Sequence, residues 1–204
     1  LYDLYIFGVI SANQLFSAPL NVLERFICCS FILLAGTSAR FSRNNLRHGL
    51  IVLGAGLVVE IGAAVAGQTI RFGVLMLLGS SMVLWHFLGK GLQRLPGWSV
   101  AAGSGVLFFA ARWWTGRTAV SVPWLYPLGF ISPGFYSADY FPLLPWFFLF
   151  LTGTALGGWC LAHRENRLLT VSLAGALTWP GRHSLIIYVL HQPVLYGISY
   201  LIWR

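Results

Sequence analysis

The residues best suited to proton chemistry lie in a stretch that is otherwise apolar. His191 is followed by Gln192 and Pro193 within the run His183–Trp203. A neutral imidazole accepts and gives protons near pH 7, and Pro193 removes one helical hydrogen bond and bends a helix. At about 1.5 Å per residue, His191 lies about 12 Å from the start of the run. We expect a polar notch there; the alternative is a hydrogen-bonded structural histidine.

Acidic residues are few, and their placement is informative. The five are Asp3, Glu24, Glu60, Asp139 and Glu165. A charge at the centre of a membrane helix costs about 2.5–3.5 kcal/mol, so it must face protein or a water-filled cavity. We expect all except Glu165 on one face of the membrane, where they line a polar cavity with Arg25 and Arg71. The alternative is ion pairing at helix ends, between Glu24 and Arg25 and between Asp139 and Arg71.

Motifs of soluble enzymes are missing from the sequence. It contains no G-x-S-x-G, no H-E-x-x-H and no Walker A motif. Cys28, Cys29 and Cys160 lie in apolar runs and have neither disulfide-framework nor metal-site spacing. We therefore expect no metal site and no permanently bound cofactor.

Membrane helices are the elements that must position these residues. The 204 residues are 57% hydrophobic and 9% charged, whereas soluble domains are about 25% charged. A span needs about 20 mostly apolar residues and must be helical, because lipid satisfies no backbone polar group. The sequence predicts an all-α transmembrane bundle. Its predicted full spans are Val22–Arg40, Arg47–Ala66, Arg71–Lys90, Gly97–Arg112, Pro142–His163 and His183–Trp203.

The expected organisation is a single transmembrane domain over residues 1–204. Leu1–Ile10 has the composition of the end of an earlier span, so we expect the first helix to be missing. Gly153 and Gly157 form a G-x-x-x-G pattern, and Gly103 lies close to Gly105, which indicates tight helix packing.

Basic residues predict the orientation of the bundle. Most of them fall in alternate loops: Arg40, Arg43, Arg47, Lys90, Arg94, Arg164, Arg167 and Arg182. The positive-inside rule makes these loops cytoplasmic. The long connection from Trp113 to Phe141 then faces out, and its aromatic residues and prolines predict an ordered loop. Because the charges form no basic face, the net charge of +8 does not indicate nucleic-acid binding.

Several segments resemble one family of membrane proteins. Gly181–Leu185, Tyr188 and His191–Pro193 are similar to the last-helix signature G-R-x-S-L-x-x-Y-x-x-H-Q-P, and Ser137–Trp146 resembles a D-Y-x-P-L-x-P-W motif. Both occur in bacterial integral-membrane proteins related to the catalytic domain of heparan-α-glucosaminide N-acetyltransferase. Weaker similarity includes Arg71–Leu75, and the resemblance covers most of the chain.

The resemblance implies acyl transfer, typically of acetyl from acetyl-CoA as co-substrate to an amine or hydroxyl of a sugar at the outer face. It implies a bacterial cytoplasmic (inner) membrane location. His191 is then the expected base or carbonyl-positioning group, and Asp139 orients it or the acceptor. The expected substrate-binding residues are Arg71, Glu60, Asp3, Arg25 and Gln192. The expected donor-binding residues are Lys90, Arg94 and Arg164.

Two other functions remain open from the sequence. One is a non-catalytic membrane subunit, in contact with a partner protein or another copy of itself. The family's upstream helix and its His are not in this chain, and Met76 stands where bacterial relatives often have His. The other is a small transporter with a proton path through Glu60, His86 and His191.

Overall fold

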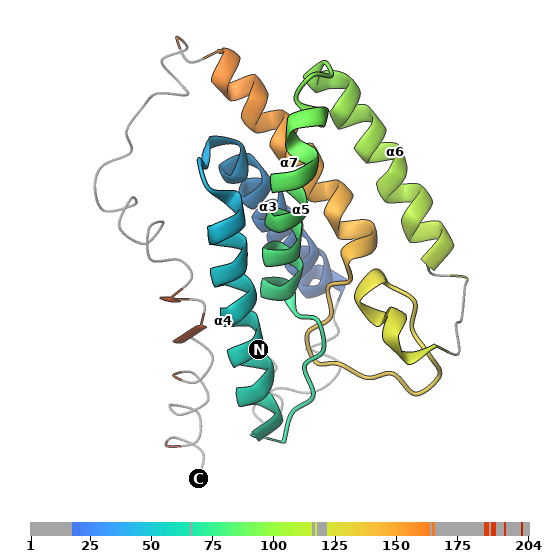
Figure 1. Ribbon diagram of the computed structural model, residues 1–204. Helices are drawn as coiled ribbons and strands as arrows, with labels where there is room; N and C mark the ends of the chain where they lie inside the picture. The colour runs from blue at the N-terminus through green and yellow to red at the C-terminus, as the bar shows by residue number, and fades with distance from the viewer. Residues whose placement is uncertain are drawn as a thin grey trace. The chain divides into compact units, whose positions relative to one another are not determined.

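The computed structural model describes residues 18–65, 67–115, 117, 122–163 and 165, together with 186, 187, 189, 190, 194 and 201. Its helices are α3 (Ala18–Phe41), α4 (Asn45–Val65), α5 (Val74–Leu92), α6 (Gly97–Thr115) and α7 (Leu143–Ala162), with the 3-10 helix η1 (Pro123–Leu128) before α7 (Figure 1). The described residues include no strand. The predicted all-α class is therefore confirmed.

The number of membrane spans differs from the prediction. Among the described residues, four segments are long and apolar enough to cross a membrane: Val22–Phe41, Asn45–Val65, Val74–Leu92 and Leu143–Ala162. Five of the six predicted full spans fall in this part of the chain, so the predicted number is slightly too high there. The fourth predicted span does form α6, but its glycines, serines and tryptophans make it less apolar than its neighbours. The predicted segments Leu1–Ile10 and His183–Trp203 lie outside the described residues, apart from six isolated positions of the second.

The chain divides into two compact units. One comprises Leu1–Cys29 and Thr170–Arg204, and its described part is the first half of α3 with the six isolated positions. The other, here called the larger unit, comprises Ser30–Leu169. Every site considered below lies within the larger unit.

Glycines bring α4 and α5 into close contact. A Cβ atom on Gly79 would lie 2.7 Å from the backbone nitrogen of Leu53, and one on Gly49 would lie 2.9 Å from the carbonyl oxygen of Gly79. Real Cβ atoms essentially never approach other atoms so closely. The two helix backbones can therefore meet only where a side chain is missing, as small-residue interfaces in membranes require.

Close contacts at glycines also join α3 to α7. A Cβ atom on Gly153 would collide with the carbonyl oxygen of Leu33, and one on Gly157 would lie 2.7 Å from that of Thr37. The Thr37 hydroxyl also donates a 3.0 Å hydrogen bond to the Gly153 carbonyl. Tight packing at the G-x-x-x-G pattern is confirmed. The prediction of tight packing is wrong for Gly103 and Gly105, where an added Cβ would meet nothing within 4 Å.

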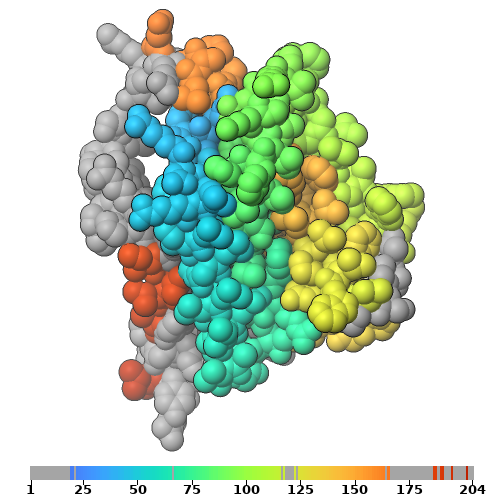
Figure 2. Space-filling model, viewed as in Figure 1, coloured from blue at the N-terminus to red at the C-terminus, as the bar shows by residue number. Residues whose placement is uncertain are grey.

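Apolar side chains cover much of the outer surface of α4. Leu57, Val58, Ile61 and Val65 are all exposed, although none is polar. Figure 2 shows α4 in cyan on the face turned to the viewer. The buried side chains of the larger unit belong instead to helices such as α5 and α7, where Leu77 and Phe150 are fully buried. Lipid is the solvent that suits such a surface.

Helices of the larger unit run in alternating directions, which places five basic residues at one end and two carboxylates at the other (Figure 1). The basic end contains the C-termini of α3 and α5 and the N-terminus of α4. Its basic residues are Arg40, Arg43, Arg47, Lys90 and Arg94. The carboxylate end contains the C-terminus of α4 and the N-termini of α5 and α7, with Glu60 and Asp139. This separation matches the alternate-loop pattern of basic residues in the sequence.

Candidate functional site

Two connections meet at the carboxylate end and form the candidate site. One joins α4 to α5, and the other precedes α7. The backbone amide of Ala138 donates to the Thr69 carbonyl at 2.9 Å, and that of Phe141 donates to the Phe72 carbonyl at 3.0 Å. The Arg71 amide donates to the Ser137 hydroxyl at 2.9 Å. Segments that are far apart in the sequence are thus fixed side by side.

Asp139 caps the first turn of α5. Its Oδ2 accepts a 3.2 Å hydrogen bond from the amide of Val74, the first residue of the helix. The preceding residue, Gly73, has no side chain to make this cap, and a Cβ there would lie 2.6 Å from Asp139 Oδ2. The first amides of a helix lack partners and carry a partial positive charge, so a carboxylate is favourable at this position. The packing of α5 therefore fixes the Asp139 side chain.

Glu60 holds the adjacent residue in an uncommon conformation. Its Oε1 accepts a 2.5 Å hydrogen bond from the amide of Phe72. Phe72 has a φ of 55° and is buried. A bulky residue rarely adopts this left-handed conformation, and such strained residues occur often at functional sites. Glu60 and Asp139 therefore bind successive parts of one backbone segment, Phe72–Val74.

Tyr140 orders the connection before α7. Its hydroxyl donates a 2.6 Å hydrogen bond to the Tyr126 carbonyl in η1. The ring of Phe135 lies 4.9 Å from that of Tyr140 and 5.8 Å from that of Tyr126, centroid to centroid. Burial, with a smaller contribution from Tyr126, raises the pKa of Tyr140 from 10.0 to about 12. At neutral pH Tyr140 is therefore a hydrogen-bond donor and not a base.

The larger unit thus unites three of the residues predicted from sequence. Glu60, Arg71 and Asp139 all belong to the paired connections or contact them. Arg71 is exposed, whereas Glu60 and Asp139 are partly buried.

Two other predicted residues lie away from this cluster. Lys90 and Arg94 are exposed at the basic end, at the far end of α5 and just beyond it. Arg25 is exposed on α3 and belongs to the other unit. The predicted residues outside the described part of the chain are Asp3, Arg164, His191 and Gln192.

Sequence reasoning missed the part that Ser137 takes in the site. Its hydroxyl accepts from the Arg71 amide and donates to the Asp139 carbonyl at 2.7 Å. Serine side chains often form a hydrogen bond with the backbone two residues further on, so the contact with Asp139 could have been recognised. The 66-residue separation from Arg71 could not have been bridged from one sequence.

Metal binding finds no support in the part of the chain that the structure describes. It contains no group of three or more His, Cys, Asp or Glu side chains placed to hold an ion. The carboxylates of Glu60 and Asp139 instead accept hydrogen bonds from backbone amides.

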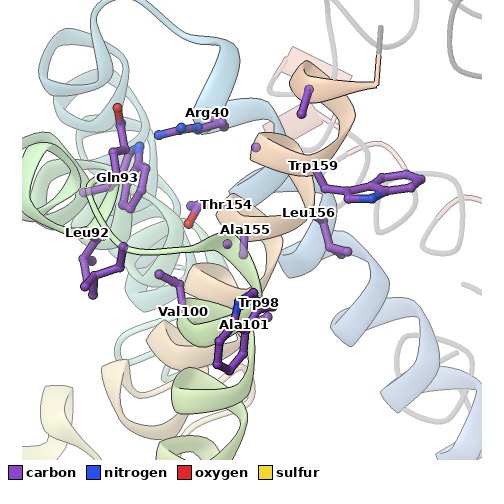
Figure 3. A pocket seen from close by; sticks show the side chains of 15 residues that line it. Arg40, Leu92, Gln93, Trp98, Val100, Ala101, Thr154, Ala155, Leu156 and Trp159 are labelled. Carbon is purple, nitrogen blue, oxygen red and sulfur yellow. The ribbon is translucent and has the colours of Figure 1, made fainter. Parts of the chain in front are cut away.

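A pocket of about 510 Å³ lies at the basic end, away from these carboxylates. The last turns of α5 and α7, the first turns of α6 and the side chain of Arg40 form its walls. Figure 3 shows Arg40 extending from α3, with Thr154 and Ala155 on α7 and Trp98 on α6.

Comparison with known proteins identifies the family. The family model described as heparan-alpha-glucosaminide N-acetyltransferase, catalytic, matches residues 1–193. No curated protein and no solved structure matches the chain. The match covers the paired connections, α5 and the basic-end pocket, and four apolar helices accompany it. The chain is therefore an acyltransferase-like integral membrane protein that belongs to the family of the heparan-alpha-glucosaminide N-acetyltransferase catalytic domain.

Proposed function

We propose that this protein transfers an acetyl group from acetyl-CoA to an amine or hydroxyl of a sugar, with the acceptor bound at the carboxylate end. Family membership supports acyl transfer as the reaction class. The observation that supports the assignment of the acceptor end is the pair of carboxylates, Glu60 and Asp139, which accept hydrogen bonds from two amides of the strained segment Phe72–Val74.

The chemistry requires a nucleophile, a base and stabilisation of charge. The acceptor nitrogen or oxygen attacks the thioester carbonyl carbon and His191 takes its proton. The C–S bond then breaks, and the sulfur receives that proton, so that CoA leaves as a thiol. Asp139 sits at the positive end of α5, which favours its charged form. It is therefore suited to orienting a protonated amine or the imidazole. Arg71 stabilises negative charge on the acyl oxygen or on the acceptor.

Donor and acceptor approach from opposite ends in this proposal. Lys90 and Arg94, with Arg164, attract the phosphates of CoA to the basic end. Helix α5 has 19 residues, so the two ends lie about 28 Å apart. The thioester must then reach into the bundle. The sequence predicts His191 about 12 Å from the start of its apolar run, and we propose it as the base. Asp3, Arg25 and Gln192 are further candidates for acceptor binding, from the family resemblance.

Localisation follows from the same charges. The basic end faces the cytoplasm, where acetyl-CoA is made, and the carboxylate end faces out. We propose the bacterial cytoplasmic membrane as the location, with a sugar supplied from the outside.

An acceptor assay in detergent tests the proposed reaction. Purified protein is incubated with acetyl-CoA and a set of amino sugars and neutral sugars, and acetylated products are measured by mass spectrometry. We expect an acetylated sugar from wild-type protein and from Glu165→Gln, a matched loss of one carboxylate at an exposed position. We expect at least a tenfold slower reaction from Asp139→Asn and from His191→Ala.

No product from folded wild-type protein with any acceptor would contradict the proposal. The non-catalytic subunit would then be favoured, and co-purification with a stable membrane partner would be its direct test.

A further inference from the structure

Arg40, a half-buried residue that lines the basic-end pocket, has one guanidinium nitrogen that its neighbours do not satisfy. Arg40 Nε is inaccessible to solvent and has no hydrogen-bond partner among the described residues. A buried donor on a charged group is costly when it is left unpaired. Arg40 has no role in the proposed reaction, so its unpaired nitrogen needs a separate explanation.

Helix α7 is shaped to accommodate the Arg40 side chain. A Cβ atom on Gly157 would lie 2.8 Å from Arg40 Cβ, and one on Gly158 would lie 3.6 Å from Arg40 Nε. The two adjacent glycines therefore leave a groove on α7, here called the track, in which the Arg40 side chain lies. Figure 3 shows this side chain extending away from α3 at one side of the pocket.

The remaining walls are mainly apolar and reach the outer surface of the bundle. Trp98 and Trp159 line the pocket and are 76% and 53% exposed. Tryptophan is enriched at membrane–water interfaces, where its ring meets both lipid and polar headgroups. The pocket thus combines one internal cation with apolar walls that continue toward lipid.

These features match one class of molecule. Arginine binds phosphate oxygens through a planar fork of N–H donors, and a phosphodiester carries a single negative charge. CoA has several phosphate charges, whereas Arg40 is the one charged side chain among the described residues that line the pocket. Lys90 and Arg94, on either side of the pocket residue Gln93 in sequence, add positive charge at this end. Clusters of basic residues on the cytoplasmic side attract anionic lipids.

We propose that the basic-end pocket binds the headgroup of an anionic phospholipid, with Arg40 on the phosphate and the acyl chains passing between Trp98 and Trp159 to the bilayer. Arg40, Trp98 and Trp159 are not among the residues assigned to acetyl transfer, and lipid binding does not depend on that activity.

Lipid titration of the full chain in detergent, followed by native mass spectrometry, tests the proposal. The probe is phosphatidylglycerol, with phosphatidylcholine for comparison. We expect Arg40→Gln to weaken phosphatidylglycerol binding at least tenfold. Arg43→Gln is the matched control, because it removes the same charge from an exposed position at the same end, and we expect it to change binding less than twofold.

A second variant separates loss of the site from loss of the fold. Val100→Trp fills the pocket and leaves Arg40 in place, and we expect it to weaken phosphatidylglycerol binding as Arg40→Gln does. Equal effects of Arg40→Gln and Arg43→Gln, or wild-type binding by Val100→Trp, would overturn the proposal. Displacement of bound phosphatidylglycerol by CoA would also overturn it and assign the pocket to the acyl donor. The acceptor assay in lipid-free detergent reports on acetyl transfer independently of these results.

Discussion

The carboxylate of Asp139 accepts a hydrogen bond from the backbone amide of Val74, 65 residues earlier in the chain. This contact joins the connection before α7 to the first turn of α5. Gly73, the residue before Val74, leaves room for the carboxylate only because it lacks a Cβ. The cap by Asp139 thus depends on the glycine at position 73. The same contact places a negative charge at the proposed acceptor site.

Removing the Asp139 carboxylate should destabilise the larger unit. Asp139→Ala leaves the Val74 amide without its cap, and loss of a helix cap typically costs about 0.5–2 kcal/mol. Asp139→Asn keeps an acceptor oxygen and should cost less, about 0.3–1 kcal/mol from the lost charge. Thermal unfolding in detergent measures both, with Glu165→Gln as the control. Equal stability of Asp139→Ala and wild type would show that the cap contributes nothing.

A methyl group at Gly73 should displace the Asp139 carboxylate. The added Cβ would lie 2.6 Å from Oδ2, so Gly73→Ala should destabilise by about 1–3 kcal/mol through overpacking. Gly62→Ala is the control, because an added Cβ there meets nothing within 4 Å. Replacing a helical glycine by alanine should be neutral or stabilising by up to about 1 kcal/mol. The contrary result is an equal response of the two variants in thermal unfolding.

Glu60 should matter for its acceptor oxygen more than for its charge. Glu60→Ala leaves the buried Phe72 amide unsatisfied, which should cost about 1–3 kcal/mol, and it frees Phe72 from one of its two backbone hydrogen bonds. Glu60→Gln retains an acceptor and should retain most of the stability. Chemical denaturation in detergent compares the two variants. A loss for Glu60→Gln as large as that for Glu60→Ala would assign the effect to charge instead.

The α3–α7 contact should not tolerate a side chain at Gly153. Gly153→Ala places a Cβ against the Leu33 carbonyl, and overpacking of this kind costs about 1–3 kcal/mol. Gly103→Ala, on the open side of α6, should have no such cost. Unfolding temperatures of the two variants measure this difference in stability. A Gly153→Ala protein as stable as wild type would mean that α3 and α7 can move apart without loss of stability.

Alkaline pH should weaken the connection that Tyr140 orders. Its pKa is raised to about 12 in the folded protein, so the folded state holds this proton more tightly than the unfolded state does. The corresponding stability is complete below pH 10 and is lost as the pH rises through about 12. Thermal unfolding between pH 9 and about pH 12 should therefore show a decline that Tyr140→Phe reduces. Tyr136→Phe is the control, and an unchanged decline in Tyr140→Phe would contradict this origin.

Much of the helical framework could be predicted from sequence, because lipid demands long apolar helices. The predicted span Val22–Arg40 corresponds to α3, and Gly97–Arg112 to α6, with ends that differ by a few residues. The G-x-x-x-G pattern correctly marked the close approach of α7 to another helix.

The contacts of the site could not be predicted in the same way. A single sequence reveals that Glu60 and Asp139 are unusual, but not that both accept hydrogen bonds from the Phe72–Val74 backbone. These partners depend on how two connections meet in space. The track of Arg40 across Gly157 and Gly158 was missed for the same reason, although the glycines themselves were visible.

Sidedness of acetyl transfer in sealed proteoliposomes tests the central claim most directly. An amino sugar is enclosed on the carboxylate side of uniformly oriented protein, and labelled acetyl-CoA is added on the basic side. The account predicts acetylated sugar in this arrangement, little product when donor and acceptor exchange sides, and at least a tenfold decrease with Asp139→Asn. Absence of product in every arrangement, or transfer that needs both substrates on one side, would contradict it.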